Sequence, residues 1–171
     1  MAKMSKARAA LMAEVFGYVT LEEANTYVEQ HYLSNSPTRL AWNSLTDEDK
    51  AVLLRNSYAA IEALPFRGSK TLCDQASAFP RYPSTEVPQR VKYAQIANAV
   101  VLSDDEFQED ALFYDKLRTY GINSYKLGNL SETILDYSHV GGSATAGAAG
   151  VYSQDALRLL QPWLGGGFRI V

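Results

Sequence analysis

Helix-start signals and prolines divide this chain into short segments, and that division constrains its fold more than any other feature. Thr20 and Glu23 have the spacing of a capping box, in which each side chain bonds the backbone of the other residue. Thr46 precedes three consecutive acids, which favour the first turn of a helix because its free N–H groups carry positive partial charge. Pro65 ends that segment, and Pro88 opens the next one. These helix-start and helix-stop signals predict a bundle of short helices.

Apolar stripes at helical spacing set the extent of these helices. They predict helices at residues 1–16, 20–33, 37–42, 46–64, 88–102, 103–121 and 153–160. The segment at 88–102 is apolar around most of its circumference, so we expect it at the centre of the bundle. Gly128-Asn129, a turn that suits a β-hairpin, lies between 122–127 and 130–137. The predicted fold class is mainly α: a small helical bundle with one β-hairpin and an extended flexible C-terminal tail.

We expect three parts: an N-terminal helical extension at 1–17, a helical domain at 18–164 with a flexible linker at about 139–150, and a tail at 165–171. The tail alternates apolar and charged residues after three glycines, a pattern that suits strand addition to another chain, although disorder fits equally well. The candidate contacts with partners or neighbouring subunits lie in the extension and the tail. They are Lys3, Lys6, Arg8, Phe168, Arg169, Ile170 and Val171.

Composition excludes several classes of protein. The chain has 171 residues, 47% hydrophobic content and a formal net charge of -3, as expected for one globular domain that is not a general polyanion binder. A single cysteine, Cys73, excludes a disulfide framework and the usual four-ligand zinc sites. No apolar run reaches the ~20 residues that span a bilayer. The first residues lack the apolar core of a signal peptide, so we expect them in the mature chain.

No set of residues points to catalysis. Glycines at 141–150 lack the lysine that completes a phosphate-binding loop. His31 and His139 have no acid or nucleophile at a defined spacing, so ordinary polar positions are favoured. The acidic run at 104–110 lacks the glycines of a calcium loop and fits a solvated helix start. We therefore predict no enzymatic activity, no cofactor and no metal.

The tyrosines and the long connection at 66–88 invite structural interpretations. Eleven tyrosines could stack unpaired nucleotide bases, but such platforms need positive charge beside them. Acidic side chains outnumber lysines and arginines 19 to 16, so a role of the tyrosines in packing is favoured. In the connection, Arg67 and Arg81 are predicted to pair with Asp74, and Gly68 to adopt a backbone conformation that other residues avoid. Trp42 and Phe79 are predicted to anchor the connection on the core.

An ordered set of short motifs carries a resemblance to a known family. The motifs are Tyr18 to Ala24, Trp42 with the helix cap after it, Phe66-Arg67-Gly68, Asp74-Gln75, Phe79-Pro80-Arg81, Val87-Pro88 and Lys126 to Gly128. Their order resembles the head–tail connector (adaptor) proteins of tailed bacteriophages, a family often labelled DnaT-like single-stranded-DNA-binding. The family often has Trp at the position of Phe79.

The resemblance implies a structural virion protein whose copies form a ring, dodecameric in typical members. The ring would sit at the head–tail interface of a phage, after assembly in the host cytoplasm. Its partners would be further copies of itself, the portal protein and the stopper or tail proteins, with no membrane contact. Double-stranded DNA would pass through the lumen without specific binding. The alternative function is single-stranded-DNA binding, which a steep salt dependence of affinity would reveal.

Overall fold

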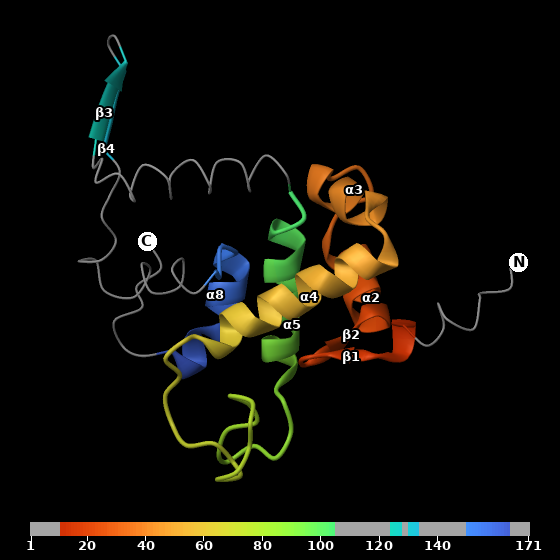
Figure 1. Ribbon diagram of the computed structural model, residues 1–171, viewed down its shortest axis with the longest axis vertical. Coiled ribbons are helices and arrows are strands. Elements are labelled where there is room, and N and C mark those ends of the chain that lie inside the picture. The colour runs from red at the N-terminus through yellow and green to blue at the C-terminus, as the bar shows by residue number, and fades with distance from the viewer. Residues whose placement is uncertain (1–10, 105–123, 128–129, 134–149, 165–171) are drawn as a thin grey trace, which may run out of the picture.

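The computed structural model describes residues 11–104, 124–127, 130–133 and 150–164 (Figure 1). The elements, in chain order, are β1 Val15–Phe16, β2 Val19–Thr20, α2 Leu21–His31, α3 Pro37–Ser44, α4 Asp47–Glu62, α5 Gln89–Val101, β3 Ser124–Leu127, β4 Leu130–Thr133, α8 Gln154–Leu160 and the 3-10 helix η1 Gln161–Trp163. The predicted fold class, a mainly α bundle with a β-hairpin, is confirmed, and β1 and β2 form a further short hairpin that was not predicted.

Helix α5 lies at the centre of the bundle, as predicted. It contacts α2, α3, α4 and α8, and α4 crosses it in Figure 1. Its middle and C-terminal residues, 94 to 100, are all buried. A helix that is apolar on all sides cannot leave one face in water without losing part of its burial, so neighbouring helices cover it. Each of the other helices is therefore positioned by the part of the α5 surface that it covers.

The chain before α2 forms a small hairpin instead of the predicted continuous helix to residue 16. Residues 11–13 are helical, and β1 then pairs antiparallel with β2, with Phe16 opposite Val19. The turn requires Gly17, whose φ is +78° and whose missing Cβ would lie 2.3 Å from the ring of Tyr58. Phe16 is fully buried. The predicted boundary between residues 17 and 18 thus falls inside a hairpin that belongs to the core.

The helix caps predicted at Thr20 and Thr46 are confirmed. Thr20 Oγ1 accepts the N–H of Glu23 at 3.2 Å, while the Glu23 carboxylate accepts the N–H of Thr20 at 2.9 Å. Thr46 Oγ1 accepts from the backbone of residue 49 at 3.1 Å, and Ser153 Oγ from that of residue 156 at 3.2 Å. Each such cap contributes about 1 kcal/mol by satisfying a donor that the helix cannot satisfy itself.

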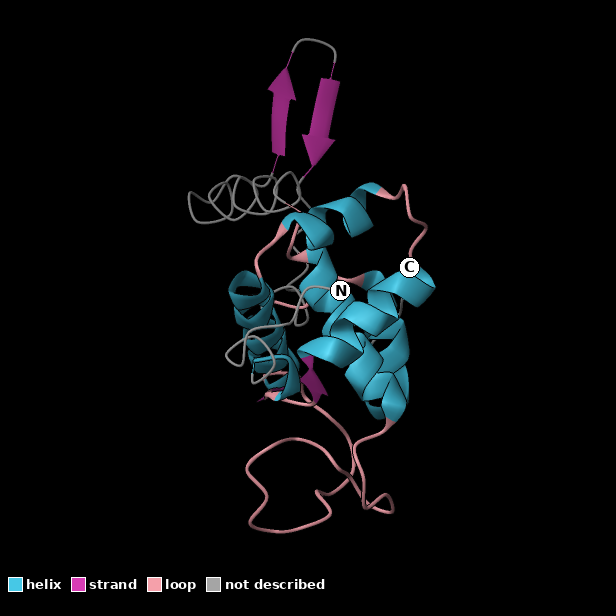
Figure 2. Cartoon of the chain, turned by 90° about the vertical axis from the view of Figure 1, so that its right-hand side faces the viewer, coloured by secondary structure: helices cyan, strands magenta, loops and turns pink. Residues whose placement is uncertain are grey.

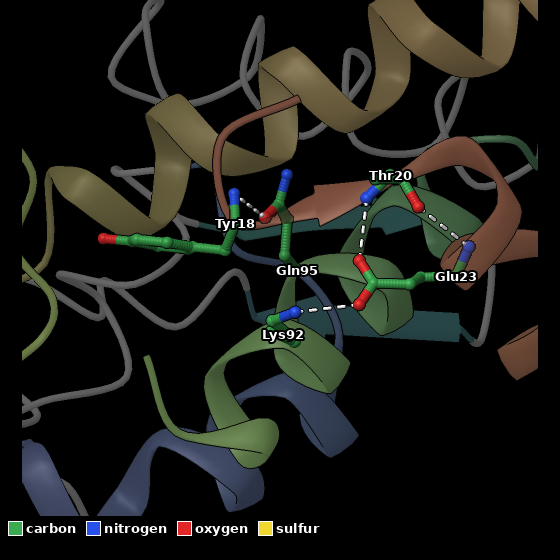
Figure 3. Close-up of polar contacts among 5 residues, drawn as sticks. All are labelled: Tyr18, Thr20, Glu23, Lys92 and Gln95. Atoms are coloured by element: carbon green, nitrogen blue, oxygen red, sulfur yellow. Dashed lines mark hydrogen bonds and ion pairs between the residues drawn. The ribbon is translucent and has the colours of Figure 1, made fainter. Parts of the chain in front are cut away.

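A buried amide ties three segments together. Gln95 of α5 accepts a hydrogen bond from the N–H of Tyr18 at 3.0 Å, drawn in Figure 3. Its amide nitrogen donates to the carbonyl oxygens of Phe16 at 2.5 Å and Leu54 at 2.9 Å. The Gln95 side chain is fully buried. Because a buried polar group is costly without partners, these three bonds fix the β1–β2 hairpin against α4 and α5.

The connection between α4 and α5 projects from one end of the bundle, at the bottom of Figures 1 and 2. Phe79 holds it to the core, with its fully buried ring edge-on to those of Tyr18, Phe66 and Trp163. The Phe79 N–H donates to the Tyr18 hydroxyl at 3.2 Å. Burial and a hydrogen bond to Glu62 raise the pKa of Tyr18, so this hydroxyl remains protonated and donates to the carboxylate.

Strands β3 and β4 pair antiparallel with Ser124 opposite Thr133 and Leu127 opposite Leu130. This register leaves two residues between the strands, as the Gly-Asn turn predicted. The strands lie within the predicted 122–127 and 130–137, and residues 122–123, 128–129 and 134–137 lie outside the described residues. Residues 105–121 of the predicted helix, residues 139–149 of the predicted linker and the tail at 165–171 also lie outside them.

Candidate functional site

A cavity of about 310 Å³ lies between α2 and α5. Both helices line it with residues spaced three and four apart, which places those residues on one face of each helix. The lining residues are Val19, Thr20, Glu22, Glu23, Thr26, Tyr27 and Gln30 on one side, and Gln89, Lys92, Tyr93 and Ile96 on the other. We call this cavity the α2–α5 groove. Its wall combines aromatic rings, amides and charged groups, a mixture that suits a flat polar ligand.

Three aromatic rings cluster at the groove. The imidazole of His31 stacks on the ring of Tyr27, with centroids 3.9 Å apart and planes inclined by 17°. The ring of Tyr93, from α5, lies 4.8 Å from that of Tyr27 and 5.5 Å from the imidazole. His31 Nδ1 donates to the Tyr27 carbonyl oxygen at 2.9 Å, which holds the imidazole against the phenol. This aromatic cluster is preorganised because each ring is held by its neighbours.

The Tyr27 hydroxyl is neutral over the physiological range of pH. Burial, followed by the nearby Tyr32 and Asp155, raises the pKa of Tyr27 to about 12. Burial and then Asp155 also raise the pKa of Tyr32. Both phenols are therefore hydrogen-bond donors and carry no charge that would repel an anionic ligand.

One ion pair lies inside the groove. The Lys92 ammonium is 2.8 Å from one carboxylate oxygen of Glu23, and the other oxygen accepts the Thr20 N–H (Figure 3). Partial burial opposes ionisation of Glu23, but the hydrogen bonds from Lys92 and Thr20 outweigh it and lower the pKa of that carboxyl. Glu22, also in the wall, has no hydrogen-bond or ion-pair partner among the described residues. Glu22 can thus accept hydrogen bonds from a ligand, whereas both carboxylate oxygens of Glu23 already have partners.

Other cations at this end of the bundle are already engaged. Arg39 donates to the carbonyl oxygens of Tyr32 at 3.0 Å and Glu29 at 3.2 Å. Arg158 pairs with Asp155 at 3.1 Å on the exposed surface of α8. An exposed pair of this kind is worth little and exchanges readily with other ions. The groove therefore offers stacking and hydrogen bonds more strongly than a field of free positive charge.

The sequence did not single out this groove. The sequence pattern predicts an ordinary polar position for His31 and a role in packing for the tyrosines as a group. Residues 23, 27 and 30 of α2 do follow a helical spacing, as do 89, 92, 93 and 96 of α5. The two faces could be recognised separately, but which helix packs beside α2 is a long-range property.

The predicted anchors of the long connection occupy different positions. The Arg81 side chain donates to carbonyl oxygens of Phe66, Arg67 and Gly68, besides that of residue 78. Gly68 has φ +80° and open space around it. Asp74 is exposed, and the predicted ion pair with the arginines is not formed among the described residues. The correction has a physical reason: four backbone carbonyls already take four of the five N–H donors of the Arg81 guanidinium.

Trp42 lies in α3 and is fully buried. Its indole N–H donates to the side-chain oxygen of Asn25 at 3.0 Å, and the Lys50 ammonium lies 5.6 Å from its ring centroid. These contacts join α3 to α2 and α4, whereas Phe79 is the fully buried aromatic side chain of the described long connection.

The remaining candidates lie outside the described residues: Lys3, Lys6, Arg8, Phe168, Arg169, Ile170 and Val171. Within the described part, no three histidine, cysteine or acidic side chains come together as a metal site, and no helix is long and apolar enough to cross a membrane. The absence of enzymatic activity, cofactor and metal remains a prediction.

A comparison with family models identifies the chain. The model described as "putative DnaT-like ssDNA binding protein" matches residues 10–170. The chain belongs to this family. No curated protein and no solved structure matches.

The match corrects the predicted function. The family description names single-stranded-DNA binding, which was the alternative, and gives no support to a structural adaptor ring in a phage virion. The match does not confirm the head–tail connector assignment. The predicted ring, the portal, stopper and tail partners, the passing duplex and the location are untested and remain predictions.

Proposed function

We propose that this chain binds single-stranded DNA, with an unpaired base in the α2–α5 groove against the partly exposed ring of Tyr93. The observation that carries the proposal is the aromatic-walled groove in a chain of this family. Base–aromatic stacking contributes about 1–3 kcal/mol per base. A duplex cannot use such a groove without exposing a base.

The charges of the groove determine how the strand would lie. Glu22, Glu23 and Lys92 give the wall a formal charge of -1 when all three are ionised, so phosphates are not attracted into it. A base is uncharged and enters without this penalty. The backbone then remains outside the groove, where exposed cations such as Arg90, the residue after the lining residue Gln89, can neutralise a phosphate. With one or two phosphates neutralised, the slope of log K against log salt should be about -0.7 to -1.4.

Fluorescence anisotropy with a labelled 15-nucleotide strand of mixed sequence tests the proposal. We expect saturable binding at low salt and much weaker binding to the duplex of the same sequence. Absence of binding to the single strand, or equal binding to the duplex, would refute the proposal.

A pair of variants tests the site. Tyr93→Leu keeps apolar bulk but removes the ring from the groove, and should weaken binding about tenfold, within the range measured for loss of one stacked base. Tyr82→Leu is the matched control because Tyr82 is 77% exposed and lies outside the groove. Equal affinities of the two variants would place the binding site elsewhere. Circular dichroism of both checks that the fold is intact.

A further inference from the structure

The hydrogen-bonding groups of the α2–α5 groove are not balanced between donors and acceptors. Glu23 uses one carboxylate oxygen for Lys92 and the other for the backbone of Thr20. The ammonium of Lys92, the one cation among the described residues of the wall, is therefore occupied by an acceptor that is already present. Glu22 lies in the same wall and keeps both oxygens available among the described residues.

The amides and hydroxyls of the wall do not offset this asymmetry. Gln30 and Gln89 each offer an N–H donor and a carbonyl acceptor, and the hydroxyls of Thr26, Tyr27 and Tyr93 both donate and accept, so these groups can pair with any base edge. The feature that discriminates is thus the carboxylate of Glu22, which accepts hydrogen bonds and cannot donate them while ionised.

We propose, on the basis of the single-stranded-DNA binding put forward above, that Glu22 makes the groove select bases that carry an exocyclic amino group and disfavour thymine. Cytosine presents an N4 amino group, which a carboxylate accepts, whereas thymine presents the O4 carbonyl at the same position. An oxygen facing the carboxylate of Glu22 gains no hydrogen bond and meets like partial charge. The comparison of these two pyrimidines isolates the effect because their rings are of equal size.

The expected size of the preference follows from the chemistry. A good pairing between a side chain and a base edge discriminates by about 5- to 150-fold. Glu22 is exposed, so water competes for its oxygens and the preference should lie near the lower end, at about tenfold. Such selectivity differs from that of a pure stacking platform, which tolerates every base because every base has a π-face.

Anisotropy titrations with labelled dC12 and dT12 at pH 7.5 test the inference on the intact chain. The wild-type protein should bind dC12 about tenfold more tightly than dT12. Glu22→Gln should reduce the ratio to within about twofold, because an amide both donates and accepts. Glu29→Gln removes the same charge from an exposed position of α2 outside the groove, and should keep the preference.

The outcomes separate this inference from the function on which it depends. Equal binding of the two strands by the wild-type protein overturns the selectivity and leaves single-stranded-DNA binding in place. A preference that Glu22→Gln retains overturns the role of Glu22. Failure to bind either strand refutes the proposed function itself.

Discussion

Replacing Gln95 with methionine should destabilise the protein by about 3 kcal/mol. Methionine matches the unbranched shape of glutamine but makes none of its strong hydrogen bonds. The change leaves the N–H of Tyr18 and the carbonyl oxygen of Phe16 without the partners that they have in the core. Each buried group left unpaired costs about 1–3 kcal/mol, and the additional apolar burial of methionine offsets part of the sum.

Urea unfolding followed by tryptophan fluorescence measures this effect, since Trp42 is fully buried and Trp163 packs on the core. For a chain of this size, a loss of 3 kcal/mol corresponds to a melting temperature lower by about 6–12 °C. Gln154→Met, at an exposed position of α8, is the matched control and should change the free energy of unfolding by less than about 0.5 kcal/mol. A loss below about 1 kcal/mol for Gln95→Met, with an unchanged denaturant slope, would refute the reasoning.

Three further predictions concern the hairpin and the groove. Gly17→Ala should lower the free energy of unfolding in urea by more than about 2 kcal/mol, because φ is positive and the new Cβ meets Tyr58. Gly68→Ala is the control: its φ is similar but its surroundings are open, so the loss should be about 1 kcal/mol. Equal losses for the two variants would contradict the predicted clash. Glu23→Gln keeps a capping-box residue and frees the lysine of the groove, so affinity for single-stranded DNA should rise and its salt slope should steepen by about 0.7. The pKa of Tyr27 is about 12 in the folded protein and 10 in the unfolded chain. Its contribution to the free energy of unfolding is therefore complete below pH 10 and is lost as the pH rises towards 12. The absorbance titration of Tyr27→Phe should lack the step that the wild-type protein shows near pH 12.

Local signals in the sequence predicted most of the helices. The Thr20 and Thr46 caps lie at the predicted helix starts because a cap depends on residues only three positions apart. The β1–β2 hairpin was missed because its strands have two residues each, too few for any alternation to be recognised, and because Gln95 stabilises it from 77 positions away. The same reason applies to the groove, whose Lys92–Glu23 ion pair joins residues 69 positions apart.

The long connection shows a different limit. Its composition predicted a pinned loop, and the sequence pointed to opposite charges as the means. Arg81 instead binds backbone carbonyls, which every residue carries and which no sequence motif marks. Side-chain pairing can be inferred from residue types, but pairing with the backbone depends on the path of the chain.

An excess of acidic over basic side chains does not by itself oppose single-stranded-DNA binding. The argument from net charge treats the strand as a line of phosphates, and for a duplex that is what a protein first meets. An unpaired strand also offers bases, which are neutral, and the α2–α5 groove presents an aromatic ring and uncharged amides to them. Net charge should then affect the salt dependence more than the affinity. A groove that binds through Tyr93 would lose most of its affinity on removal of that ring and little on addition of salt, whereas phosphate binding would give the reverse.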